Sequence, residues 1–129
     1  MIAVDTNVIV RLLAQDDPEQ EERAAQVMKS DGVFIAKTVL LETQWVLRHA
    51  YGFDGIVVLE AFKKLLGLPN VTVEDPQAVF QAIEWVESGM DFADALHLAS
   101  SMKAGKFITF DRKFSNKATQ LTTVEISTP

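Results

Sequence analysis

Four acidic residues in distant parts of the chain stand where carboxylates could do chemistry: Asp5, Glu42, Asp94 and Asp111. Asp5 and Asp111 each follow a short apolar run that is typical of a buried strand. Glu42 and Asp94 fall in the early turns of predicted helices. Because ligands of open α/β sheets bind at the carboxyl ends of parallel strands, we expect the four side chains to meet at one sheet edge.

Such a cluster has a definite electrostatic consequence. Carboxylates packed together repel one another, and some would have to take up a proton. A divalent cation removes the conflict, since Mg²⁺ prefers oxygen ligands, keeps some of its waters and bridges readily to phosphate. A metal of this kind lowers the pKa of a bound water and stabilises the charge of an in-line phosphoryl displacement. The pattern therefore favours metal-assisted chemistry on phosphate esters.

Each acid also has an ordinary explanation when it is taken alone. Asp5 opens an Asp-Thr-Asn sequence that suits a turn. Glu42 could be an exposed helix residue, Asp94 could simply suit the helix dipole, and Asp111 could cap a turn. Asp91 is predicted to be the N-cap of its helix rather than a metal ligand. The agreement among the four placements favours the cluster.

The elements that would position these acids alternate along the chain. Short apolar runs predict strands at 2–4, 33–35, 71–73, 106–110 and around 124–126. Caps, prolines and glycines predict helices at 8–13, from Pro18 to about Gly32, from a Thr38 cap to Gly52, from Asp54 to Gly67, from Pro76 to Gly89 and from Asp91 to Gly105. This order predicts one α/β domain over residues 1–129, with a mostly parallel central sheet flanked by helices.

Composition limits the class of protein. The 129 residues suit one domain, and 48% are apolar, which supports a sizeable core. No apolar run approaches the roughly 20 residues of a membrane span. The first residues lack the pattern of a signal peptide, and the chain has no cysteine for disulfides or thiolate metal sites. These features predict a cytoplasmic protein.

The charge is unevenly distributed. A net charge of −6 argues by itself against a nucleic-acid ligand. Acids crowd residues 16–22, however, whereas the only acids after Asp94 are Asp111 and Glu125. The late segment carries Lys103, Lys106, Arg112, Lys113 and Lys117. A basic face there could meet phosphate despite the overall sign, and a merely solvated surface explains the charges equally well.

Four segments together resemble one known family. They are Val4-Asp5-Thr6-Asn7, Leu41-Glu42, Asp91-Phe92-Ala93-Asp94-Ala95-Leu96 and Thr109-Phe110-Asp111-Arg112-Lys113-Phe114. Their order and spacing are similar to those of PIN-domain proteins, especially the VapC toxins of toxin–antitoxin pairs. The resemblance covers essentially the whole chain. One departure is Lys113, because many relatives have an acid at that position.

The resemblance implies a PIN-like three-layer sandwich and a Mg²⁺-dependent endoribonuclease, with Mn²⁺ as a substitute. It implies that Asp5, Glu42, Asp94 and Asp111 are the catalytic and metal-binding acids. Thr6, Asn7 and Thr109 would orient them by hydrogen bonds. The charge distribution, rather than the resemblance, predicts that Arg112 and Lys113 form a basic rim for RNA, because they directly follow Asp111. The product would carry a 5′-phosphate and a 3′-hydroxyl.

The resemblance also implies partners. A VapC-like toxin would be a homodimer and would be held inactive by a VapB-like antitoxin. The antitoxin would bind in a groove between the early helices, which span Val8 to Met28 and combine apolar residues with dense acids. A basic partner segment would complement that charge.

Three alternatives remain open at this point. A PIN nuclease could process RNA as housekeeping, without an antitoxin. A receiver-type phosphoacceptor domain also places acids at strand ends and binds Mg²⁺, but it usually has an acidic pair after its first strand and an Asp after a central one. Here only Asp5 follows the first strand, and no Asp ends the 33–35 strand. The third alternative is a catalytically inactive interaction module.

Overall fold

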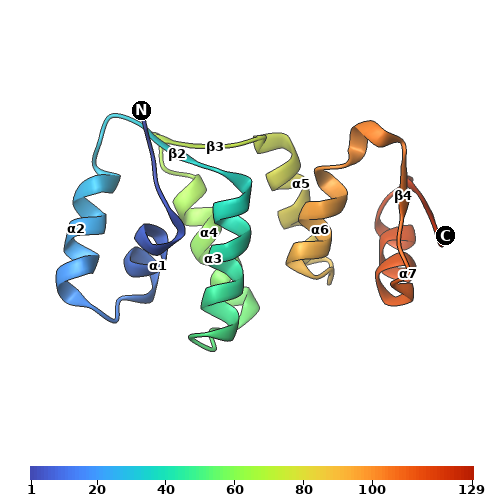
Figure 1. Ribbon diagram of the computed structural model, residues 1–129, viewed down its shortest axis with the longest axis horizontal. Helices are drawn as coiled ribbons and strands as arrows, with labels where there is room; N and C mark the ends of the chain where they lie inside the picture. The colour runs from blue at the N-terminus through green and yellow to red at the C-terminus, as the bar shows by residue number, and fades with distance from the viewer. The chain divides into compact units, whose positions relative to one another are not determined.

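The computed structural model describes residues 1–129, with seven α-helices, one short 3₁₀ helix and five short strands (Figure 1). The chain forms two compact units, Met1–Glu74 and Asp75–Pro129. All strand pairs are parallel, as the sequence predicts, and they form a three-stranded sheet in the first unit and a two-stranded sheet in the second.

The first unit is a small parallel sheet with four helices. Its strands lie in the order β1-β2-β3, and they span Ile2–Ala3, Val33–Ile35 and Val71–Val73. Its helices are α1 (Thr6–Ala14), α2 (Pro18–Met28), α3 (Lys37–His49) and α4 (Gly55–Leu66). The fully buried side chains of this core include Ile9, Ile35, Leu40, Leu47 and Phe62. The apolar runs and helical spacings of the sequence therefore do form one packed interior.

Helix starts in this unit follow local capping chemistry. Asp17 and Asp54 accept a backbone N–H from the first turns of α2 and α4, and Pro18 occupies the first position of α2. Both helices begin where the sequence predicts. The predicted Thr38 cap is wrong. Helix α3 begins at Lys37 because the chain turns directly after β2, and its N-cap, Ala36, makes no side-chain cap bond.

The second unit contains α5 (Pro76–Glu87), α6 (Phe92–Ala99), a 3₁₀ turn (Met102–Ala104), β4 (Lys106–Ile108), α7 (Arg112–Leu121) and β5 (Glu125–Ser127). Helices α5 and α6 pack together through buried side chains such as Val79, Ile83 and Leu98. Strand β5 pairs with β4, with Lys106 opposite Glu125 and Ile108 opposite Ser127.

Helix α7 is absent from the sequence prediction, which passes from the strand at 106–110 directly to the last strand. Two features of the sequence nevertheless mark this helix, an N-cap and a pair of apolar residues at helical spacing. Asp111 is the N-cap and accepts the N–H of Phe114 at 2.9 Å. Phe114 and Ala118, four residues apart, are its buried positions, and the Phe114 ring packs on Phe107 with centroids 5.2 Å apart. None of the seven α-helices combines the length and the apolar character that a membrane span requires.

Candidate active site

Two of the four acids are joined within the first unit. The Asp5 side chain caps α1, where its Oδ1 accepts the backbone N–H of Thr6 at 2.8 Å. The buried Thr6 hydroxyl donates a hydrogen bond to Oε1 of Glu42 on α3. Thr6 therefore bonds to both carboxylates and leaves the second oxygen of each available for another ligand.

These two acids line a cavity of about 310 Å³ together with Thr6, Asn7 and Tyr51. Arg11 lies on the same cavity and is held by neighbours, because its Nη1 donates to both carboxylate oxygens of Asp16 at 3.1 Å and to the Tyr51 hydroxyl at 3.1 Å. The hydrogen bond from Tyr51 and the guanidinium of Arg11 lower the pKa of Asp16. This cluster connects the end of α1 to the residues that follow α3.

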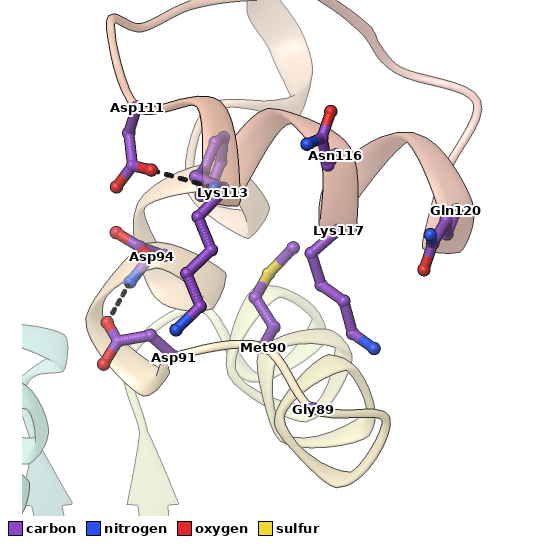
Figure 2. Close-up of a pocket in the computed structure, with 10 residues that line it drawn as sticks. Gly89, Met90, Asp91, Asp94, Asp111, Lys113, Asn116, Lys117 and Gln120 are labelled. Carbon is purple, nitrogen blue, oxygen red and sulfur yellow. Dashed lines mark hydrogen bonds between the residues drawn. The ribbon is translucent and has the colours of Figure 1, made fainter.

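The other two acids lie in the second unit, at the starts of α6 and α7 (Figure 2). Asp91 caps α6, with Oδ2 accepting the backbone N–H of Asp94 at 3.1 Å, as predicted. Asp111 caps α7 with one oxygen, and its own N–H donates to the hydroxyl of Thr109 at 3.0 Å. Both capping carboxylates are exposed, whereas Asp94 is half-buried.

The environment of Asp94 disfavours its charged form. Burial of the carboxyl raises the pKa of Asp94, and the nearby negative charges of Asp91 and Asp111 raise it further, while His97 lowers it. The sequence predicts raised carboxyl pKa values from mutual repulsion. For Asp94 the direction agrees, but burial contributes more than repulsion does.

A cavity of about 750 Å³ lies in front of these acids. One side is lined by Asp91, Asp94 and Asp111, and another by side chains of α7 that include Lys113 and Lys117 (Figure 2). Arg112, which the sequence places on the same rim, is exposed and is not among the lining residues. Lys117, one of the late basic residues named from the sequence, also lines the cavity. Its place beside Lys113 follows from helix α7, which the sequence does not predict.

The structure thus brings Asp5 together with Glu42 and places Asp94 and Asp111 around one cavity. Neither unit by itself brings three or more Asp, Glu, His or Cys side chains close enough to hold a metal ion. The donors are nevertheless suited to Mg²⁺, because all are carboxylate oxygens.

Comparison with known proteins identifies the family. The PIN domain model matches residues 2–120, a range that runs through both units and includes all four acids. The chain belongs to the PIN-domain family. This confirms the family resemblance of the four sequence segments and rules out the receiver-type alternative.

The PIN-domain chain is also similar to a solved structure, the VapC20 toxin of Mycobacterium tuberculosis, which is described as cleaving the sarcin–ricin loop. The two sequences are 26% identical, and the similarity covers 90% of this chain and 94% of that one, with a TM-score of 0.45. No curated protein matches the chain. The family assignment supports a nuclease, and none of the comparisons shows a metal.

Proposed function

We propose that this PIN domain is a metal-dependent endoribonuclease whose centre uses all four acids, Asp5, Glu42, Asp94 and Asp111. The observation that carries the proposal is the single family match over both acid pairs, since it treats the two units as parts of one PIN domain. The four acids together offer the carboxylate oxygens that Mg²⁺ prefers as ligands.

The residues have distinct tasks in this proposal. Asp5 and Asp94 hold Mg²⁺ or Mn²⁺, with Glu42 and Asp111 completing the oxygen donors directly or through water. The bound ion supplies positive charge to the phosphate and makes a coordinated water more acidic. Thr6 fixes the position of Glu42, and helix N–H groups fix one oxygen of Asp5 and of Asp111. These hydrogen bonds limit the rotation of the carboxylates, so that the donors are oriented before substrate arrives.

The direct test is cleavage of single-stranded RNA by the full chain. Activity should require Mg²⁺ or Mn²⁺, stop on addition of chelator, and leave 5′-phosphate and 3′-hydroxyl ends. A matched control is Asp31→Asn, because Asp31 is an exposed acid at the turn before β2 and outside both cavities. Cleavage that persists in Asp94→Asn or in excess chelator would contradict the proposal.

We further propose that the enzyme is the toxin of a toxin–antitoxin pair. An exposed apolar groove of about 530 Å³ lies between α1 and α4, lined by Leu12, Leu13, Val57, Leu65 and Leu68 among others. The hollow between α1 and α2 is more polar, with Arg11 and Arg23 among its lining residues. The α1–α4 groove therefore suits the apolar side of an antitoxin segment better than the hollow between the two early helices.

The antitoxin distinguishes this proposal from a housekeeping nuclease. A short reading frame beside the gene, whose product binds the chain and stops cleavage, supports the toxin. Cleavage that no neighbouring product inhibits favours housekeeping. We also propose that the toxin is a homodimer. Light scattering of the purified chain measures its mass in solution and tests this.

A further inference from the structure

Helix α7 presents two lysines to the cavity in front of Asp94 and Asp111. Lys113 and Lys117 are four residues apart and extend from the same side of the helix, Lys113 toward Asp91 and Lys117 toward Gly89 (Figure 2). Their spacing along the helix axis is about 6 Å. Neighbouring phosphates of an extended RNA strand can lie this far apart.

The ammonium groups of Lys113 and Lys117 form no bonds within the protein. Lys106 and Lys63, for comparison, form ion pairs with Glu125 and Glu60. No ion pair or side-chain hydrogen bond involves Lys113 or Lys117. Both cations are therefore available to a ligand.

The Lys117 side chain reaches across the cavity to Gly89. Gly89 follows α5 with a φ of +106°, a conformation that other residues rarely adopt. A Cβ at Gly89 would lie 3.0 Å from Lys117 Nζ and 3.1 Å from its Cε, so the end of the lysine would have to move by a few tenths of an ångström. The Lys117 ammonium therefore lies close to the Gly89 backbone, on the far side of the cavity from its own helix.

We propose that Lys113 and Lys117 hold successive RNA phosphates on one side of the scissile bond, so that the strand runs along α7 away from Asp111. The inference rests on the proposed ribonuclease function and adds the path of its substrate. Lys113 binds the phosphate nearer the acids, and Lys117 binds the next one. Arg112 is outside this path because it does not line the cavity. The contacts are to the backbone, so they confer affinity without base preference.

The test measures binding separately from cleavage. A short, end-labelled single-stranded RNA is titrated with the full chain carrying Glu42→Gln, which should prevent cutting, and anisotropy is followed over a series of salt concentrations. Lys117→Gln should weaken binding and flatten the slope of log affinity against log salt by roughly 0.7, the value for one phosphate contact on a single strand. Lys113→Gln combined with Lys117→Gln should flatten it by roughly 1.4.

The matched control is Lys103→Gln, because Lys103 is an exposed lysine of the same unit that lies outside the cavity. Lys103→Gln should leave the slope unchanged. Equal slopes for Lys117→Gln and Lys103→Gln would overturn the path along α7, as would a parent chain that does not bind RNA. If RNA binding depends on Lys117 but the chain that keeps Glu42 does not cleave RNA, the result would support the path and refute the nuclease.

Discussion

The carboxyl group of Asp94 lies in an environment that opposes its negative charge. Because its pKa is raised in the folded chain, the folded state binds a proton more tightly than the unfolded state does. Stability is therefore lost as pH rises from the ordinary pKa of an aspartate through the raised value, and the loss persists above it. In the absence of metal, this residue destabilises the fold at neutral pH.

Asp94→Asn should remove this destabilisation of the folded state. We expect a higher melting temperature than wild type at neutral pH in chelator, with the difference disappearing at pH values below the ordinary range of aspartate. Thermal unfolding followed by circular dichroism over a pH series measures it. A lower melting temperature for Asp94→Asn at neutral pH would show that the carboxylate is structural. The same variant should cleave RNA roughly a hundredfold or more slowly, the scale for loss of a key electrostatic group.

Thr6 acts through another residue, and its hydroxyl can be removed with little change of shape. Thr6→Val keeps the buried volume but leaves Glu42 without its donor. We expect cleavage or metal affinity to fall roughly 10- to 100-fold, as for other groups that orient metal ligands. Thr6→Ser should restore most of the loss, since it returns the hydroxyl. Titration of activity with Mn²⁺ for both variants tests the role, and equal activity of Thr6→Val and wild type would reject it.

At the scale of single elements, prediction succeeds where the signal is local. Helices α2, α4, α5 and α6 begin where the sequence predicts, because the bond that caps each start joins an Asp to a backbone N–H only two or three positions further on. The sequence does not predict helix α7, because most of its residues are polar and only Phe114 and Ala118 are buried. The partner of Phe114 is Phe107, which lies on β4, so this contact is not visible in the helix itself.

The groove between α1 and α4 provides a prediction about the partner. Val57 on α4 is 57% exposed and lines this groove, so Val57→Asp should cost little stability. It should strongly weaken inhibition by the antitoxin while cleavage stays near wild type. The measurement is RNA cleavage titrated with the product of the neighbouring frame. Met102→Asp is the control, since Met102 is an exposed apolar residue outside the groove. Full inhibition of Val57→Asp would place the antitoxin elsewhere.

At the scale of the whole molecule, the sequence predicts more of the site's chemistry than of its geometry. Motif order identifies the family and predicts the four acids, and the predicted cap role of Asp91 is confirmed. The sequence predicts that Glu42 lies near Asp5 and that Thr6 orients the acids. It does not predict that the Thr6 hydroxyl bonds to Glu42, because this contact between residues 36 positions apart depends on how α1 packs against α3. For the same reason, Lys117 could not be placed opposite Gly89.

The last prediction asks whether one metal centre draws on both units. Asp5→Asn retains a good N-cap for α1, and Asp94→Asn should not destabilise the second unit, so both variants should fold. If the acids share one centre, each single variant should lose most of the Mn²⁺ affinity and most of the rise in melting temperature that Mn²⁺ produces. The double variant should then lose little more than either single variant, because the residues act as a unit. Calorimetric titration with Mn²⁺ measures affinity and stoichiometry for all four proteins. Losses that add independently, with each single variant still binding an ion at full affinity, would mean that Asp5 and Asp94 serve separate sites.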